Sequence, residues 1–598
     1  MRKELGWRWT FELAFCGDLY KEPVRPSFFN KLHWWLKHFS RIFSCTAIMD
    51  STTSPPASSE PKIPSPATIG VESTGNQANE ATHAIQLERD LSLRDTFKLY
   101  PRAIMFSFVI SLAVIMEGYD TNLMGNFYPY PSFKNRFGDE VDPEGGMLVS
   151  AKWQTIIGNS TQVGSILGLF LNGIVSERFG YRMTMIYSMV ALIGTIFIPF
   201  FATSLEMFVA AGILQGLPWG IFQTLAVTYA ADICPTSLRA YMTSWINMCW
   251  VIGQLISSGM LRGLLNRTDE WGYKIPFAVQ WVWPIPIMIG TFLAPESPWW
   301  LIRKGRNEEA KSALLTLTTR NSGVEFDVDA QVSMMAVTNR FEIESSSGAH
   351  YWDCFRGTDR RRTEIAMMVW LTQAFCGIPF MSFSTQFYLR AGLNNEDAYS
   401  MNIGQTALGL VGCLIAWWLM TKCGRRTLYV WGLTAMFVLL MAIGFCGLKP
   451  NAGSAWAAGS LLLVFLFVFQ LSVGPTCYSL VAEIPSTRLR IKTVALARAM
   501  YNAGGFINNA LMPQMMGLNA WNWGAKAGFF WAGIDALFLV WVFFRLPEPK
   551  GLTYSELDLL FEHGVGARGF SQSAADLLKP VLQDVGVVDE KVTAVHVE

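Results

Sequence analysis

The feature that most constrains this chain is a series of apolar segments, each about as long as a membrane-spanning helix. A helix needs about 20 mostly apolar residues to cross the hydrocarbon core of a bilayer. Six segments precede a polar stretch and six follow it, at about 103–126, 152–175, 183–202, 206–231, 240–262, 276–294, 365–390, 398–420, 427–447, 456–482, 491–516 and 525–546. Only 16% of the residues are charged, against about 25% in average soluble proteins. The sequence therefore predicts an all-α membrane protein with twelve transmembrane helices in two six-helix halves.

The stretches outside these segments complete the predicted organisation. Residues 50–92 are rich in Ser, Pro and Thr, a composition too poor in apolar residues to fold alone. Met49 opens a stretch typical of a cytoplasmic tail, so residues 1–48 are predicted to be dispensable, and whether they belong to the natural protein stays open. The predicted regions are a disordered cytoplasmic N-terminal region (1–92), an N-terminal six-helix half (93–294), a cytoplasmic central loop with short helices (295–364), a C-terminal six-helix half (365–546) and a cytoplasmic C-terminal tail (547–598).

Charged residues in the short loops predict the orientation in the membrane. Basic loops stay in the cytoplasm, and the turns after segments 2 and 8 and the central loop are basic. The opposite loops carry acidic runs such as "GDEVDPEGG" (138–146). Both termini and the central loop should therefore be cytoplasmic. Asn266, in the external triplet "NRT", is then a candidate for N-glycosylation.

Composition and motifs exclude several classes of function. The net charge of +1 gives no field that would attract nucleic acid. The ten cysteines show no metal-ligand or CxxC spacing, and no P-loop or nucleophile–base motif is present. We therefore expect no enzyme activity, no metal and no cofactor. All six histidines lie outside the apolar segments, so any proton chemistry inside the membrane must use carboxylates.

Two carboxylates lie inside the first apolar segment, in "IMEGYDTNLMG" (115–125). Acidic groups in a membrane helix are costly and usually face a cavity where they handle ions or protons. Glu117 and Asp120 are three residues apart, so they share one face of a helix. Burial and mutual repulsion should favour a bound proton on at least one of them. The alternative is a wetted or hydrogen-bonded acid near the outer interface with no further role.

Three pairs of stretches recur at matched positions in the two halves. They are "GIVSERFGYR" (173–182) with "WLMTKCGRR" (418–426), "ADICPTSLR" (231–239) with "AEIPSTRLR" (482–490), and "PESPWWLIRKGR" (295–306) with "PEPKG" (547–551). Glycines permit tight turns, and arginines can pair with acids at neighbouring helix ends. Parallel repeats of this kind occur among secondary transporters. The predicted gating and structural residues are Gly173, Glu177, Arg178, Gly180, Arg182, Asp232, Arg239, Glu296, Gly424, Arg425, Glu483 and Arg490.

These motifs resemble those of the sugar porters of the major facilitator superfamily. Longer stretches such as "QGLPWGIFQTLAVTYAADICPTSLRAY" and "AEIPSTRLRIKTVALAR" are similar to the fungal maltose permease branch, the α-glucoside–proton symporters. The resemblance covers about residues 95–570. It implies the major facilitator fold and import of an α-linked disaccharide such as maltose, with a proton, across the plasma membrane by a functional monomer. It also makes Asp120 the presumed proton carrier.

Polar residues inside the apolar segments are candidates for binding the sugar. A buried amide is costly unless it is paired, and the alternative to sugar binding is hydrogen bonding between helices. The candidates are Asn159, Gln162, Gln386, Gln405, Gln254, Gln373, Tyr478 and Asn502, of which the family pattern favours the last four. Ser165 stands where many α-glucoside symporters carry an acid. Arg498 is expected to be structural, and Asp535 matches no motif.

Three other functions remain open at this point. A proton-independent facilitator of a sugar or polyol would have the same architecture, as would a hexose transporter. A sensor that binds sugar without transporting it would usually have a longer cytoplasmic tail than the roughly 50 residues expected here, which makes sensing the less favoured alternative.

Overall fold

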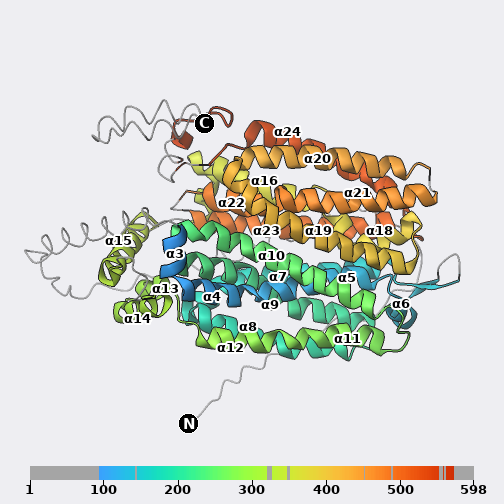
Figure 1. The fold of residues 1–598 in the computed structure, drawn as a ribbon, viewed down its shortest axis with the longest axis horizontal. Helices are drawn as coiled ribbons and strands as arrows, with labels where there is room; N and C mark the ends of the chain where they lie inside the picture. Colours follow the sequence, from blue (N-terminus) through green and yellow to red (C-terminus); the bar gives the residue numbers. More distant parts are fainter. Residues whose placement is uncertain are drawn as a thin grey trace, which may run out of the picture. The chain divides into compact units, whose positions relative to one another are not determined.

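A computed structural model describes most of the chain between residues 93 and 570. The described residues are 93–141, 145–319, 326–346, 350–449, 451–486, 489–550, 552, 557 and 560–570. The predictions for residues 1–92 and for most of the C-terminal tail lie outside them. Within the described residues, long helical runs form two groups of six, shown from blue to green and from yellow to red in Figure 1.

Each group of six is built from long helices, some of them interrupted. The runs of the first half are α4 (Pro101–Ser111) with α5 (Ala113–Phe127), α7 (Ala151–Phe179), α8 (Tyr181–Phe200), α9 (Leu205–Ile233), α10 (Thr236–Gly263), and α11 (Trp271–Val279) with η2 (Gln280–Val282) and α12 (Pro284–Leu293). Those of the second half are α16 (Gly357–Phe375) with α17 (Pro379–Ser382) and α18 (Ser384–Ala391), α19 (Asn395–Lys422), α20 (Arg425–Cys446), α21 (Ala452–Leu471) with α22 (Val473–Glu483), α23 (Arg490–Met516), and η4 (Gly524–Lys526) with α24 (Ala527–Arg545).

Eight of these runs are long and apolar enough, by length and composition alone, to cross a membrane. The other four are α7, α10, α16 with α17 and α18, and α23, which carry more polar residues. These polar runs lie where the halves meet, because α7 packs on α23, α10 packs on α19, and α17 and α18 pack on α5. Polar residues inside a membrane protein usually face the bundle interior or a water-filled cavity. The polarity of these four runs therefore marks the interface between the halves.

Small residues allow the helices of the first half to pack closely. A Cβ atom added at Gly164 of α7 would lie 2.2 Å from the carbonyl oxygen of Ile213 in α9. One added at Gly118 of α5 would lie 2.1 Å from the carbonyl oxygen of Trp250 in α10. Close backbone approach through small residues is the usual way in which membrane helices associate, because lipid supplies little hydrophobic drive for their contact.

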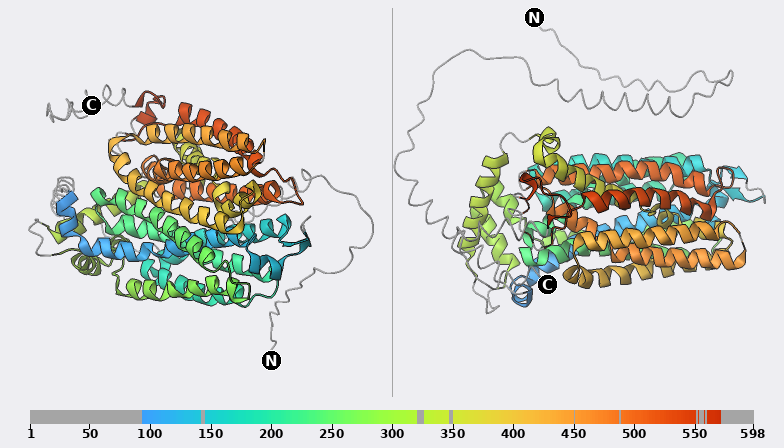
Figure 2. Two further views of the ribbon diagram at one scale, coloured as in Figure 1. Left: turned by 45° about the vertical axis from the view of Figure 1, so that its right-hand side comes forward. Right: turned by 90° about the horizontal axis from the view of Figure 1, so that it is seen from above.

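The two ends of the bundle carry different additional elements. At one end lie the helices between the halves, α13 (Pro298–Arg303), α14 (Asn307–Leu317) and α15 (Val328–Ser346), as both views of Figure 2 show. We call this the central-loop end. The opposite, far end carries α6 (Pro131–Phe137) and a hairpin of β1 (Glu140–Val141) and β2 (Met147–Leu148), paired antiparallel with Glu140 opposite Leu148. Between the halves the described residues form α13, α14 and α15, and α16 begins about two turns before the predicted start of the seventh segment.

Candidate functional site

The two acids of the first segment are buried in α5, and each has its own amide partner. Glu117 is 6% exposed and accepts a hydrogen bond from the side-chain amide of Gln223 in α9. Asp120 is 4% exposed and accepts one from the side-chain amide of Gln280 in η2. The sequence analysis considered the acids as a mutually repelling pair. In the structure their partners lie on two different helices of the first half.

A buried arginine continues the contacts of Glu117 into the second half. Arg498 of α23 donates from Nε to Oε1 of Gln223 over 2.9 Å, so Gln223 links Glu117 to Arg498. The guanidinium also lies 4.6 Å from the ring centre of Trp370 and 4.7 Å from that of Tyr501. The sequence analysis gave Arg498 only a structural role and missed Gln223 altogether. The sequence did contain a signal for this contact. Arg498 is a cation inside one apolar segment, and Glu117 and Asp120 are acids inside another, so an interaction between these segments could have been predicted.

Several of the predicted amides carry polar atoms that have no hydrogen-bond partner among the described residues. These buried atoms are Oδ1 of Asn159, Oε1 of Gln373 and Nδ2 of Asn502. The other end of Gln373 donates to the carbonyl oxygen of Gly474 over 3.4 Å. Two of the unpaired atoms are acceptors and one is a donor. A ligand with several hydroxyl groups, which both donate and accept, could satisfy them.

The remaining predicted binding residues have identifiable neighbours. Gln254 is buried in α10, and its backbone carbonyl accepts a hydrogen bond from Asn122. Gln162 of α7 lies against α23, because a Cβ atom added at Gly505 would be 2.8 Å from its Nε2. The ring of Tyr478 packs edge-on against Trp370, with centres 4.9 Å apart. The structure therefore places Gln162 and Tyr478 close to α23 and its partners, and Gln254 of α10 beside α5.

A network of asparagines, which the sequence analysis missed, joins the halves at the far end. Nδ2 of Asn402 in α19 donates to Oδ1 of Asn126 in α5 over 3.1 Å, and the backbone NH of Thr385 donates to the same oxygen over 3.2 Å. Tyr399 donates from its hydroxyl to the carbonyl oxygen of Asn126 over 3.0 Å. A Cβ atom added at Gly125 would lie 2.0 Å from a backbone oxygen of α17. The halves are therefore closed together at the far end.

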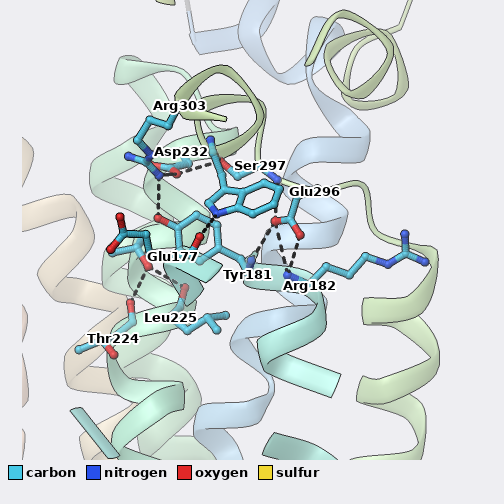
Figure 3. Close-up of polar contacts among 11 residues, drawn as sticks. Glu177, Tyr181, Arg182, Thr224, Leu225, Asp232, Glu296, Ser297 and Arg303 are labelled. Carbon is cyan, nitrogen blue, oxygen red and sulfur yellow. Dashed lines mark hydrogen bonds and ion pairs between the residues drawn. The ribbon is translucent and has the colours of Figure 1, made fainter. Parts of the chain in front are cut away.

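At the central-loop end, one carboxylate holds the turn between α7 and α8 (Figure 3). Glu296 accepts hydrogen bonds from the backbone NH groups of Tyr181 over 3.0 Å and Arg182 over 3.2 Å. Gly180 has φ of +86°, and an added Cβ atom would lie 2.4 Å from Oε2 of Glu296. Burial raises the pKa of Glu296, and the backbone NH groups oppose that shift. Glu296 is thus the N-terminal cap of α8.

The second half repeats this cap. Glu548 accepts hydrogen bonds from the backbone NH groups of Arg425 over 2.8 Å and Arg426 over 3.1 Å. A Cβ atom added at Gly424 would lie 2.1 Å from Oε2 of Glu548. The guanidinium of Arg426 donates to the carbonyl oxygen of Phe543, as that of Arg182 does to the carbonyl oxygen of Phe292. Glu548, although it lies in the quoted "PEPKG", was not among the predicted residues.

Ion pairs at the central-loop end differ between the halves. In the second half, Arg425 pairs with Glu483 over 3.3 Å. In the first half, the matched position is Tyr181, and Asp232 instead lies 3.7 Å from Arg303 of α13 and accepts from the hydroxyl of Ser297 over 2.8 Å (Figure 3). Arg303 also donates to the hydroxyl of Tyr181 over 3.0 Å. A central-loop helix thus supplies the cation that the repeated turn lacks.

Some predicted motif residues have other positions than expected. Gly173 lies inside α7, exposed, with no atom near its missing Cβ, so the prediction that it permits the tight turn is wrong. Glu177 is exposed and contributes its backbone carbonyl, which accepts from Nε1 of Trp300 over 3.2 Å. Arg178 packs on the Phe179 ring at 5.6 Å and has no described acidic partner, contrary to the expected pairing. The turn depends on the capping carboxylate, because that group contacts the backbone directly.

Four further residues complete the comparison with the sequence predictions. Arg490 is the first residue of α23, and Arg239 lies in α10, at a position whose side chain is outside the described part. Asn266 is exposed in the loop after α10, at the far end. Asp535 is fully buried in α24, and neither carboxylate oxygen has a hydrogen-bond partner among the described residues.

Comparison with known proteins decides the family. The profile of the "Sugar (and other) transporter" family matches residues 106–561. The chain belongs to this family. It is therefore a membrane transport protein, as predicted, and not a member of an enzyme family.

Its relatives include permeases of Saccharomyces cerevisiae. The general alpha-glucoside permease is 38% identical over 524 residues, which cover 87% of this chain and 85% of the relative. Maltose permease MAL31 is 38% identical over 519 residues, covering 86% and 84%. The predicted resemblance to the maltose permease branch is confirmed.

Solved structures show the same fold. The proton:xylose symporter XylE, bound to 6-bromo-6-deoxy-D-glucose, matches with a TM-score of 0.64 and 21% identity, over 77% of this chain and 99% of that one. The inward open conformation of XylE from E. coli matches with a TM-score of 0.60 and 20% identity, again over 77% and 99%. The predicted major facilitator fold is confirmed.

The capping geometry predicts different effects at two glycines of one motif. Gly180→Ala would force a side chain into a strained backbone region, at a cost of about 1–3 kcal/mol, and would displace Glu296. We expect less protein at the cell surface and slower transport. Gly173→Ala, at an exposed helical site, should change neither quantity. Surface labelling and uptake measure both, and equal losses in the two variants would contradict the assignment.

The ion pairs predict that one substitution compensates for another. Arg303→Ala removes one cationic partner of Asp232, and since such partly exposed pairs are worth about 0.2–1 kcal/mol, we expect transport to slow by up to about fivefold. Tyr181→Arg places a cation where the second half has Arg425, so it should restore the rate of the Arg303→Ala variant. Arg306→Ala, at a surface pair with Glu309, is the control. Failure of Tyr181→Arg to restore uptake would show that Arg303 does not act through Asp232.

Proposed function

We propose that this protein imports an α-linked glucoside, such as maltose, together with a proton across the plasma membrane. The observation that carries the proposal is the pair of buried acids in α5, each bonded to an amide, with Glu117 linked to Arg498 in the other half. The substrate class is supported by relatives named α-glucoside and maltose permeases. A facilitator has no need for buried ionisable groups between its halves, whereas a proton-coupled importer does.

The orientation follows from the basic loops. We take the central-loop end, with both termini, to be cytoplasmic. The far end, with its asparagine network, then faces outside and is closed in this structure. Among the ion pairs at the central-loop end, Arg425–Glu483 and Arg545–Glu364 lie within the second half, and Arg303–Asp232 joins the central loop to the first half. Rocking of rigid halves around a central site, as in other transporters built from repeats, would leave these pairs intact. Since one chain supplies both halves, a monomer suffices.

The sugar would bind among the unpaired amides in the middle of the bundle. The acceptors of Asn159 and Gln373 and the donor of Asn502 come from α7, α16 and α23. Because α7 and α23 belong to different halves, a sugar bound between them would contact both. The rings of Tyr478 and Trp370 offer apolar faces of the kind that pack against the C–H surface of a sugar.

The two acids would have different roles in coupling. Asp120 is bonded within the first half, to Gln280, and we assign it the transported proton. Glu117 reaches Arg498 across the interface through Gln223, so its charge affects how strongly the halves are linked. A change of charge at this link would bias the equilibrium between conformations, because a ligand or proton shifts conformations only through its differential interaction with them.

The amides predict a pattern of binding defects. Alanine at Gln254, Gln373 or Asn502 should raise the KM for maltose roughly two- to twelve-fold each, the worth of one hydrogen bond to a neutral ligand. Gln405 is the matched control, because its Oε1 already accepts from the hydroxyl of Tyr388 over 2.5 Å. Gln405→Ala should reduce the amount of folded protein and leave KM unchanged. Reduced surface protein with an unchanged KM in all four variants would show that these amides only join helices.

The acids predict a separation of coupling from binding. Asp120→Asn keeps the hydrogen bond from Gln280 but cannot carry a proton, so uphill accumulation and maltose-induced alkalinisation of the medium should stop while downhill exchange persists. Glu117→Gln should be milder. Gln223→Leu should impair coupling at least as much as Glu117→Gln, because it breaks the link to Arg498, whereas Glu117→Gln removes the charge and keeps the acceptor. The measurement is external pH on adding maltose to lightly buffered cells.

Three outcomes of that experiment would be decisive against parts of the proposal. Accumulation by the Asp120→Asn variant would exclude Asp120 as the carrier. Normal coupling in Gln223→Leu with a defect in Glu117→Gln would exclude the link through the amide. Transport of maltose by the unaltered protein without any proton uptake would favour the proton-independent facilitator.

A further inference from the structure

A polar cavity lies at the far end, separate from the unpaired amides in the middle of the bundle. Its volume is about 400 Å³. Both halves line it, the first with Tyr128, Lys134 and Gln154 and the second with Gln386, Arg390 and Asn519. Pockets for small organic ligands usually measure about 300–1,000 Å³. The cavity therefore has room for a sugar of one or two rings.

Two side chains in the wall of this cavity have an unused acceptor. Gln154 is 4% exposed and Gln386 is 5% exposed, and Oε1 of each has no hydrogen-bond partner among the described residues. Nε2 of Gln154 donates to the carbonyl oxygen of Val149 over 2.9 Å, which fixes the orientation of that amide. A buried acceptor without a donor destabilises the protein. Both oxygens need hydrogen-bond donors.

The chemistry of the wall selects among ligands. An ionised carboxylate brings only acceptors and could not satisfy the oxygens of Gln154 and Gln386, although the cavity is also lined by Lys134, Lys152 and Arg390. Arg390 already donates from Nε to the carbonyl oxygen of Met516 over 3.1 Å, and Glu140 accepts from Asn519 over 3.0 Å. Hydroxyl groups donate as well as accept. A neutral polyhydroxylated molecule fits these requirements best.

Because both halves line the cavity, its shape depends on their contact at this end. Tyr128 of the first half stacks on Phe383 of the second, with ring centres 6.1 Å apart. The bond between Asn519 and Glu140 also joins the halves. When the halves separate here, the two walls move apart and the ligand loses half of its contacts. A ligand that binds one conformation only shifts the equilibrium towards that conformation.

We propose that this cavity is an outer subsite for the sugar, occupied while the far end is closed, through which abundant external substrate slows its own import. The substrate class and the orientation rest on the proposed function. A sugar bound there would bridge the closed halves and delay their reopening to the outside. Import would then rise with external maltose, pass through a maximum and fall.

The test compares uptake rates over a wide range of external maltose in three variants. Gln386→Met keeps an unbranched side chain but removes the acceptor, and should shift the falling limb to roughly two- to twelve-fold higher maltose. Ala520→Trp, in the cavity wall, should abolish the falling limb by filling the space. Ala457→Trp, exposed on α21, is the matched control and should behave as the unaltered protein. The rising limb, which reports the central site, should be the same in all four proteins.

A binding measurement keeps the two proposals separate. Equilibrium dialysis of the purified full-length protein in lipid nanodiscs, with labelled maltose, should give two molecules per chain for the unaltered protein and for Ala457→Trp. It should give one for Ala520→Trp. Maltose transport with a single site and no falling limb would overturn the outer subsite and leave the proposed function standing. Absence of both maltose binding and maltose transport would overturn the proposed function itself.

Discussion

Buried polar groups need hydrogen-bond partners, and the arrangement of this bundle depends on how that need is met at three levels. At the central-loop end, Glu296 and Glu548 satisfy the free backbone NH groups that begin α8 and α20. At the far end, asparagines of α5 and α19 satisfy one another across the halves. Between these levels, atoms of Asn159, Gln373 and Asn502 have no hydrogen-bond partner in the part of the chain that the structure describes. Each of these atoms costs free energy while it has no hydrogen-bond partner. Such atoms are expected in a binding site whose polar ligand is not bound.

The repeated caps explain how each half can move as a unit. Glu296 follows α12 and caps α8, so the third and sixth runs of the first half are tied together. Glu548 follows α24 and ties α20 to it in the same way. A carboxylate at a helix N-terminus also interacts favourably with the helix dipole. Where the repeat is broken, at Tyr181, the central loop supplies Arg303 instead. The Arg303–Asp232 pair therefore attaches the central-loop helices to the first half. The matching pair in the second half, Arg425–Glu483, lies within that half.

The sequence predicted the fold well and the partners of the site poorly, for physical reasons. Long apolar segments and matched turns predict the helical runs, because both depend on residues close together in the chain. Even so, four polar runs fall short of the hydropathy that marks a span, since their polar residues face other helices. The amide partners of Glu117 and Asp120 come from α9 and η2, a hundred or more positions away. Such contacts depend on packing, which no local pattern records. The predictions for Gly173 and Arg178 were wrong for a different reason. Both residues belong to a recognisable local motif, but the contact that stabilises the turn comes from Glu296, which is distant in the sequence.

The helix α5 carries both the buried acids and the asparagines that join the halves at the far end. It carries Glu117 and Asp120, which contact α9 and η2, and, further along, Asn122 and Asn126, which contact α10 and α19. Asp120 and Asn126 are about 9 Å apart along the axis at 1.5 Å per residue. A helix transmits a shift over that distance almost without loss, because its backbone hydrogen bonds keep it rigid. A change in hydrogen bonding at either acid would therefore move the asparagines that close the far end. In the proposed mechanism, the acids would control access to the bundle without lining its entrance.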